Sequence, residues 1–277
     1  MMVINYHHTF SQFRDINWVF GDSTGLNFSL SSPLYLNSSI FTQEPCASIS
    51  DESENLQFYT NGAKDWTKEH EIMTLGNHLF IGGVGWPLST ITQGVIIIPD
   101  PGDTNQYYIF QNDNPFYYSK VDMSLSDGFG SVYIHNEILY DIPAMEKMTA
   151  VKHGNGRDGW LIIPAYPEGG SDGYGNPLLY YEFLITPDGI EGPFIKEGVI
   201  YENQNAVISI GQMKFNRPGD FLGVTNGKSV ILYKFDRCAG DLYNPEIIVS
   251  VFSGSNGDFL YGLDFSPDGT KMYVSKA

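Results

Sequence analysis

Basic residues are scarce in this chain. Only 15 Lys and Arg stand against 32 Asp and Glu in 277 residues, so the formal net charge is −17 and the pI is near 4.5. Nucleic acids and anionic membrane surfaces bind proteins through clustered basic side chains. The charge therefore argues against both as partners. An acidic surface suits a soluble extracellular protein, one that could hold divalent cations, although solubility alone explains the charge.

Long apolar runs and cysteines are also few. No run approaches the roughly 20 residues that a helix needs to cross a bilayer, so we expect no membrane insertion. Residues 1–15 are predicted to be disordered or the remnant of a signal peptide, because TFSQ resembles a cleavage site without its apolar segment. Cys46 and Cys238 lie in different repeats and are expected to be buried free thiols, since cysteine often behaves as a small hydrophobe.

Helical periodicity is absent too, whereas strand and turn residues are abundant. The chain holds 18 Tyr and 18 Phe, which suit the faces of β-strands, and 30 Gly with 15 Pro, which suit many tight turns. No stretch shows the spacing of an amphipathic helix. The composition predicts an all-β protein.

One pattern, an apolar run followed by a polar turn and a second run, occurs five times. Its turns recur about every 54 residues, close to the period of propeller blades. Further alternating runs supply a third and a fourth strand, the composition of a blade. We therefore predict a WD-like or kelch-like β-propeller of four-stranded blades, about five of them visible. The five copies are residues 46–62, 94–113, 149–165, 211–227 and 262–277.

The repeats divide residues 16–277, a single propeller domain. Residues 16–41 are expected to be the two outer strands of a last or clasp blade. Blades 1 to 4 are then residues 42–90, 91–145, 146–205 and 206–255, and residues 256–277 are the inner strands of blade 5. Pairing of the two ends would give a closed five-blade ring, and without pairing the chain would be the front part of a longer ring. In the closed case, Trp18→Ala should cost around 3 kcal/mol.

Several phrases resemble one known group of proteins. They cover nearly the whole chain, from Asn17 to Ala277, and include NWVFGDSTGLNF, CASISDESENLQFYTNG, TAVKHGNGRDGWLII and YGLDFSPDGTKMYVS. They are similar to the propeller region of secreted surface proteins of gliding bacteria, which carry a gliding-motility-associated C-terminal domain for type IX secretion. The resemblance implies a secreted or cell-surface location, and it names no reaction.

The chain departs from that group in two ways. Propellers of the group have seven blades, roughly 380 residues at this repeat length, so the resemblance favours a truncated part of a seven-blade ring over a natural five-blade ring. Glu54–Asn55 also replaces the usual Gly-Asn pair of a turn, which leaves the turn type open.

The most polar of the inner turns holds the candidate binding residues. His, Arg and Asp together could grip a carboxylate or a sugar, since a guanidinium offers two parallel donors. Alternatively the group is a hydrogen-bonded β-turn in which Asp158 caps backbone amides. The candidates are His153, Asn155, Arg157, Asp158 and Trp160.

Other motifs favour structural roles. The Gly21–Gly25 segment matches G-x-S-x-G but precedes a strand-like run, so a hairpin is predicted instead of a nucleophile elbow. Carboxylate-rich turns could bind calcium, but their spacing matches no known calcium loop. His70, His78, His135 and His153 are too scattered for a zinc site. Trp66, Trp86 and Trp160 are expected to pack between blades and not to form a sugar platform. The acidic turns contain Asp51, Glu52, Glu54, Asn55, Asp100, Asp103, Asn105, Asp172 and Asn176.

Two functions follow. The first is a non-enzymatic binding or scaffold module that presents its loops to a protein or polysaccharide at the cell surface, with no catalytic residues and no cofactor. The second is a propeller hydrolase or lyase acting on surface glycans or lactones, with a site in the axial funnel. Two or more titratable groups converging at the axis would favour the enzyme.

Overall fold

Strands account for nearly all regular structure in the computed structural model, which describes residues 14–77, 90–142, 144–166, 177–200, 209–250 and 259–276. The one helical element in these ranges is a three-residue 3₁₀ turn, η1 (Ser126–Gly128). None of the described helical structure is long enough to cross a membrane.

The strands form successive antiparallel sheets in chain order. The first holds β1 (Asn17–Phe20), β2 (Asp22–Asn27) and β3 (Leu34–Phe41). The next two hold β4 (Ala47–Ser50), β5 (Leu56–Thr60), β6 (Lys64–Thr67) and β7 (Ile72–Asn77), and then β8 (Val95–Pro99), β9 (Gln106–Gln111), β10 (Phe116–Asp122) and β11 (Ser131–Tyr140). A parallel bridge between Thr74 and Ser131 joins β7 to β11, so these two blades share an eight-stranded sheet that the sequence did not predict.

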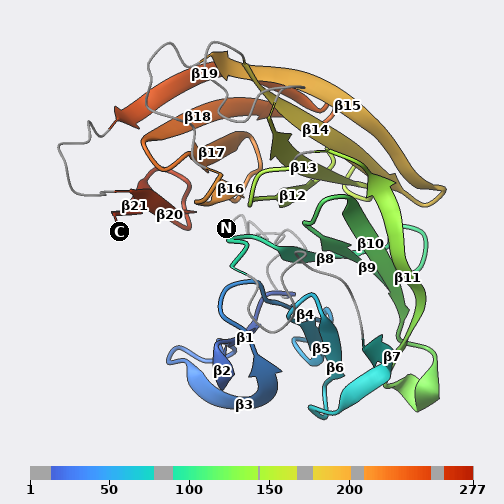
Figure 1. Ribbon diagram of the computed structural model, residues 1–277. Helices are drawn as coiled ribbons and strands as arrows, with labels where there is room; N and C mark the ends of the chain where they lie inside the picture. The colour runs from blue at the N-terminus through green and yellow to red at the C-terminus, as the bar shows by residue number, and fades with distance from the viewer. Residues whose placement is uncertain are drawn as a thin grey trace, which may run out of the picture.

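The remaining sheets repeat the same order. One holds β12 (Thr149–Lys152), β13 (Gly159–Ala165), β14 (Pro177–Thr186) and β15 (Gly189–Ile200), and the next β16 (Met213–Phe215), β17 (Phe221–Thr225), β18 (Ser229–Asp236) and β19 (Asp241–Ser250). The last described pair is β20 (Leu260–Phe265) and β21 (Met272–Lys276). The first strands β4, β8, β12, β16 and β20 lie nearest a common centre, and the later strands fan outward (Figure 1).

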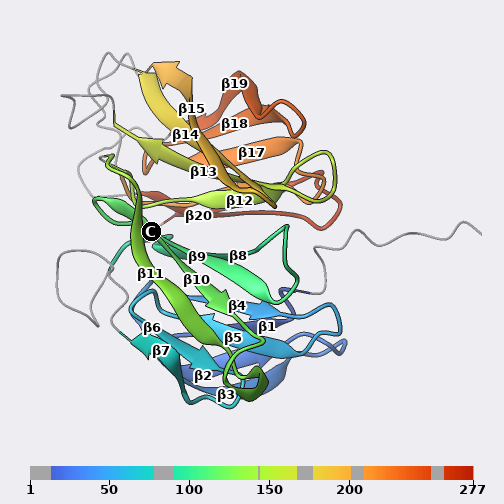
Figure 2. The same cartoon turned by 90° about the vertical axis from the view of Figure 1, so that its right-hand side faces the viewer.

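Each apolar cluster lies between two neighbouring sheets. Tyr180 of β14 and Tyr233 of β18, for example, belong to one cluster between the third and fourth blades. Phe110 and Phe183 belong to another, between the second and third blades. Figure 2 shows the sheets stacked flank to flank. Because every sheet covers an apolar flank of the next, the predicted β-propeller of four-stranded blades is confirmed.

The two ends of the chain do not share a blade. β1–β3 and β20–β21 form separate sheets, so the described strands make an open arc (Figure 1) and the considered clasp is absent. Residues 17–41 also form three strands where two were expected, because Gly21, with φ of +66°, closes a tight hairpin between β1 and β2. Trp18 is 48% exposed, so the 3 kcal/mol expected for its removal is too large.

Candidate functional site

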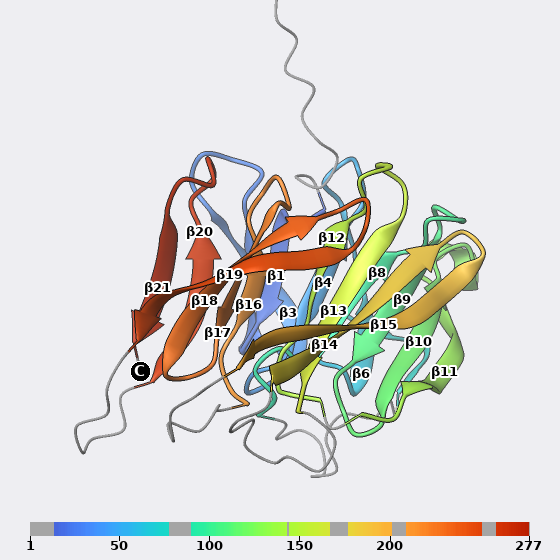
Figure 3. The same ribbon diagram turned by 90° about the horizontal axis from the view of Figure 1, so that it is seen from above.

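Loops cluster at the two ends of the strands that surround the common centre. The first strand of every blade begins at one end, here called the entrance end, and turns into the second strand at the opposite end, called the turn end. Figure 3 shows these hairpin turns along one edge of the molecule. The predicted binding residues 153–158 lie at the turn end, between β12 and β13.

The predicted group forms one closed hydrogen-bonded turn. Asp158 accepts from Arg157 Nε at 2.6 Å and from Asn155 Nδ2 at 2.7 Å, so both carboxylate oxygens are occupied. The Arg157 guanidinium lowers the pKa of Asp158, and Asn155 adds to the effect. Asn155 Oδ1, and not the expected Asp158 carboxylate, accepts the backbone amides of residues 157 and 158. A ligand role for the turn stays a prediction.

The same turn is held against the next blade. His153 Nε2 lies 3.1 Å from the Cys238 carbonyl oxygen, and Trp160 Nε1 donates to the Arg237 carbonyl at 2.9 Å. Gly240 packs so closely that an added Cβ would lie 2.7 Å from the Trp160 ring. These contacts give the turn a structural role, the locking of blade 3 to blade 4.

The other predicted motifs are also turns. Asp51 Oδ1 accepts backbone amides of residues 53 and 55, and Asp100 accepts one from Gly102 and pairs with Lys120 at 2.6 Å. Asp103 likewise accepts the amide of residue 105. The G-x-S-x-G segment is the β1–β2 hairpin, as predicted. Trp86, His78, Asp172 and Asn176 lie outside the described residues.

The cysteines and tryptophans can also be compared with the predictions. Cys46 and Cys238 are free thiols, as predicted, but Cys46 is half-buried and Cys238 is exposed, where two buried side chains were expected. Trp66 and Trp160 are buried between blades. In the ranges that the structure describes, no three His, Cys, Asp or Glu side chains lie together in a way that could hold a metal ion.

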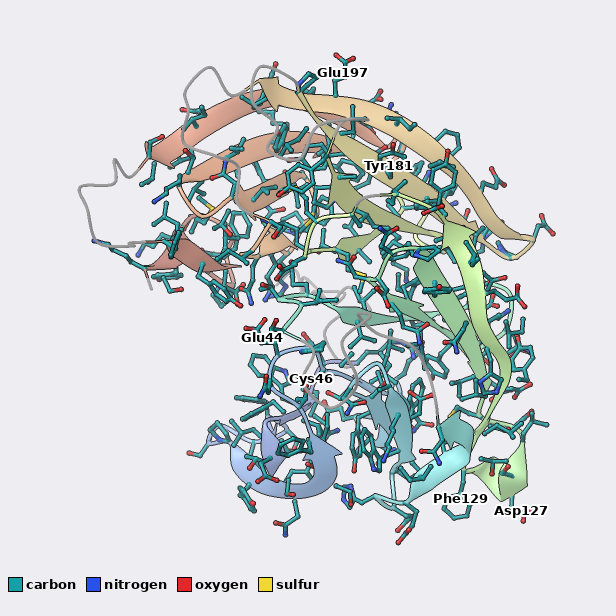
Figure 4. The ribbon with its side chains drawn as sticks, in the orientation of Figure 1. Glu44, Cys46, Asp127, Phe129, Tyr181 and Glu197 are labelled. Carbon is teal, nitrogen blue, oxygen red and sulfur yellow. The ribbon has the colours of Figure 1, made fainter. Side chains whose placement is uncertain are left out.

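A different polar cluster lies at the entrance end, on the axis. Tyr261 of β20 donates to Thr92 Oγ1 at 3.1 Å, and Thr92 Oγ1 lies 3.5 Å from Glu146 Oε2. Ser209 Oγ donates to Glu146 Oε1 at 3.1 Å, and Glu44 lies close enough to Tyr261 and Glu146 for both to act on its pKa. These five residues, the axial cluster, come from five different blades. Blades 1, 2 and 5 can meet in this way only at the centre, where Figure 4 shows Glu44.

The two carboxyl groups of the cluster have different surroundings. The Glu44 side chain is exposed, but partial desolvation raises its pKa; the Tyr261 phenol opposes the shift, and the charge of Glu146 adds to it. Glu146 accepts hydrogen bonds from the Thr92 and Ser209 hydroxyls, one on each carboxyl oxygen. Burial also raises the pKa of the Tyr261 phenol, and the neighbouring Glu44 charge adds to it. The direction of its pKa shift makes Glu44 the candidate proton donor of the cluster.

Two buried side chains brace the axial cluster. Lys147, 1% exposed, donates to the carbonyls of Ile210 at 2.9 Å and Thr225 at 2.5 Å. Burial lowers the pKa of Lys147 to about 7. The Gln93 amide donates to the Met213 carbonyl at 3.1 Å and accepts the Met213 amide at 2.9 Å. Because these contacts fix the segment that carries Ser209, they also fix its hydroxyl on Glu146.

The sequence analysis missed the axial cluster, although a signal existed. Glu44, Thr92 and Glu146 each stand three residues before the first strand of their blade, which begins at Ala47, Val95 and Thr149. In a propeller, equivalent positions on the innermost strands converge, so the register of the repeat could have pointed to them. Their types differ from blade to blade, which hides them from a motif search.

Comparison with known proteins gives matches of structure alone. No family model matches the chain, and no curated protein matches its sequence. A candidate 6-phosphogluconolactonase from Bacteroides uniformis has a TM-score of 0.46 and 13% identity over 92% of this chain and 71% of its own. The periplasmic gluconolactonase of Pseudomonas aeruginosa has a TM-score of 0.42 and 10% identity over 92% of this chain and 76% of its own. At these identities the likeness concerns the fold only.

Proposed function

We propose that this propeller is a hydrolase that opens a small cyclic sugar ester at the axial cluster. The observation that carries the proposal is the meeting of Glu44 and Glu146, from two non-neighbouring blades, in one hydrogen-bonded network at the axis. Two carboxyl groups with different environments are the usual means of dividing acid and base work in one site. The structural neighbours include proteins described as lactonases, and they serve here only to suggest test compounds.

The chemistry assigns one role to each carboxyl group. The Glu146 carboxylate takes a proton from a water molecule as the water oxygen bonds to the lactone carbonyl carbon. The ring C–O bond of the tetrahedral intermediate then breaks, and the Glu44 carboxylic acid gives its proton to the departing oxygen. Water is consumed, a hydroxy acid is released, and proton transfer from Glu146 to Glu44 through solvent restores the starting state. General acid and base groups of this kind contribute about 10²–10⁴-fold each.

A small substrate fits the axial cluster better than a glycan chain. Among the described residues, Trp66 and Trp160 are buried between blades and Trp18 lies on the first sheet, so none of the three joins the axial cluster. Polysaccharide sites often stack sugar rings on several exposed aromatic faces, and the axial cluster holds one aromatic side chain, Tyr261. The cluster instead offers hydroxyls and carboxyls, which suit a compact polyhydroxylated ring.

The test is hydrolysis of D-glucono-1,5-lactone and related lactones, measured against the spontaneous rate. Glu146→Gln should lower kcat at least about 100-fold and Glu44→Gln about 10- to 100-fold. Glu197→Gln, on the outer strand β15 and exposed, should leave activity unchanged. A lactone and glycoside panel hydrolysed at the spontaneous rate, or activity that survives both axial variants, would refute the proposal.

A secreted scaffold is the second candidate function. The outer strands β15 and β19 expose apolar side chains, which could contact a protein or polysaccharide partner at the cell surface. The acidic composition and the resemblance to gliding-associated surface proteins support this placement. Antibody detection on intact cells and in culture medium tests it, and detection only after lysis would contradict it. The exposed residues include Phe194, Ile195, Tyr243, Ile247, Ile248 and Val249.

A further inference from the structure

A carboxyl group between blades 1 and 2 is buried without a partner. Asp65 of β6 is 0% exposed, and in the described part of the chain neither of its carboxylate oxygens accepts a hydrogen bond. A charge that leaves water without a partner strongly destabilises a fold, so buried carboxylates are paired, protonated or bound to a cation. The presence of Asp65 at this position therefore needs an explanation.

The repeat shows that this position does not require a polar side chain. Blades 1 and 4 share a turn of sequence TNG, in which Asn61 Oδ1 and Asn226 Oδ1 each accept the backbone amides two and three residues further on. The residue four places after the Asn is Asp65 in blade 1 and Val230 in blade 4. Val230 is buried in an apolar cluster with residues of β20. Blade 1 thus places a carboxyl group where blade 4 packs an aliphatic side chain.

Asp65 points into the interface between the two blades. It lies opposite Thr60 in the β5–β6 ladder, so the two side chains share one face of the sheet. Phe58 lies on that same face and packs with Ile109 of blade 2 in one apolar cluster. The Thr60 hydroxyl donates to the Lys64 carbonyl at 2.9 Å and not to the carboxylate. The carboxyl group is therefore enclosed between blades 1 and 2.

Further oxygen atoms line this interface. Gln111 and Ser119 of blade 2 are both 0% exposed, and the Gln111 amide reaches across to the Gly62 carbonyl, in the turn just before Asp65. The contacts of this amide are long: Nε2 lies 3.4 Å from the Gly62 oxygen and 3.4 Å from Asn136 Oδ1, and Oε1 lies 3.3 Å from Ser119 Oγ. Good hydrogen bonds of this kind measure about 2.9 Å. Because a carbonyl oxygen has two lone pairs, the Gly62 and Gln111 oxygens can each take a further contact.

We propose that this interface binds a monovalent metal cation, Na⁺ or K⁺, through the Asp65 carboxylate and the Gly62 and Gln111 oxygens. Carboxylate and carbonyl oxygens are the ligands that hard cations prefer. One carboxylate balances one positive charge, whereas a divalent ion would leave a net charge buried between the blades. A site with one carboxylate also agrees with the absence, in the described ranges, of three clustered His, Cys, Asp or Glu side chains. The ion joins blade 1 to blade 2 and is independent of the axial cluster.

The alternative is a neutral carboxylic acid without a ligand. Burial raises the pKa of Asp65 from 3.8 to about 7, so the contribution of a neutral acid is intact below pH 3.8 and is lost as the pH rises through about 7 in any salt. A bound cation instead stabilises the ionised form, and the effect grows with the concentration of the cation. Above the raised pKa the two explanations therefore predict different responses to the cation.

Thermal unfolding of the whole chain at about pH 8.5 measures this response. NaCl, KCl and choline chloride are compared at one concentration, about 200 mM, so that screening is equal. The wild type should unfold at least about 3 °C higher in NaCl or KCl than in choline chloride, because a ligand of the folded state raises its stability. Asp65→Asn and Asp65→Val, the second carrying the blade 4 side chain, should each unfold at one temperature in all three salts. The exposed control Glu197→Gln should keep the wild-type difference.

Each result decides for or against the cation. Equal unfolding temperatures of the wild type in the three salts overturn the proposal, and so does a difference that Asp65→Asn and Asp65→Val retain. Glu182 is another buried carboxyl group without a partner, and loss of the difference in Glu182→Gln would overturn the proposal by placing the ion between blades 3 and 4. Stronger stabilisation by CaCl₂ than by NaCl at equal ionic strength, abolished by the Asp65 variants, would contradict the monovalent class.

Discussion

The burial of Glu182, in β14, leads to a specific prediction about how the stability of the protein depends on pH. Its side chain is fully buried, and neither carboxylate oxygen has a hydrogen-bond partner. Burial raises its pKa from 4.5 to about 8, while Lys196 lowers it and Asp241 raises it. In the folded chain Glu182 is therefore a neutral acid over most of the range in which an unfolded glutamate is ionised.

The sign and size of the effect follow from this difference. A raised folded pKa leaves the contribution of Glu182 intact below pH 4.5, and the contribution is lost as the pH rises from 4.5 to about 8. Each pKa unit corresponds to 1.36 kcal/mol, so the loss is on the order of 4 kcal/mol. Glu182→Gln cannot ionise and should lack this loss. The buried amide lacks partners too, which costs about 1–3 kcal/mol at every pH.

Urea unfolding of the wild type and Glu182→Gln between pH 4.5 and 8.5 measures the effect. At pH 4.5 the neutral acid and the amide are both buried without partners, so the two proteins should have similar stability. The difference in unfolding free energy should then move in favour of the variant by on the order of 4 kcal/mol by pH 8. Glu197→Gln, exposed on the neighbouring strand β15 and labelled at the outer rim in Figure 4, is the control and should show no such trend. A pH-independent difference for Glu182→Gln would refute the account of its burial.

Three further predictions concern local structure. Glu54 has a φ of +70°, a left-handed conformation that strains a residue with a side chain. Glu54→Gly should therefore stabilise the chain by about 0.5–1 kcal/mol in thermal unfolding, and a loss of stability would contradict the inferred backbone strain. Gly240→Ala should cost at least about 2 kcal/mol because its Cβ would clash with Trp160, whereas Gly156→Ala, equally left-handed but with no atom within 4 Å, should cost less. Burial raises the pKa of Cys46 to about 11, so maleimide at pH 7.5 should label only the exposed Cys238, and labelling of both thiols would contradict the packing.

The fold could be predicted from the sequence because each repeat contains a recognisable hairpin turn. Asp51, Asn216 and Asp268 each accept backbone amides in the hairpin between a first and a second strand, so they mark the blades directly. The outer edge was less predictable. The bridge that joins β7 to β11, and the third strand in residues 17–41, depend on contacts and tight turns that carry no strong apolar pattern.

The site could not be predicted in the same way. The sequence drew attention to His153, Arg157 and Asp158 because reactive types stand close together along the chain, and in the structure they bond to one another and to the next blade. Glu44, Glu146 and Tyr261 are far apart in sequence, and the curvature of the arc alone brings them together. Polar residues that are close in sequence usually form a turn. Residues that meet at the axis of a propeller can be identified only when the strand positions of each blade are known.

The most direct test of the axial site is a crystal structure of the chain with gluconolactam. The account predicts density for the ring at the entrance end, within hydrogen-bonding distance of Glu44 and Glu146. Density at the His153 turn, or none at the axis under conditions in which calorimetry shows binding, would contradict it.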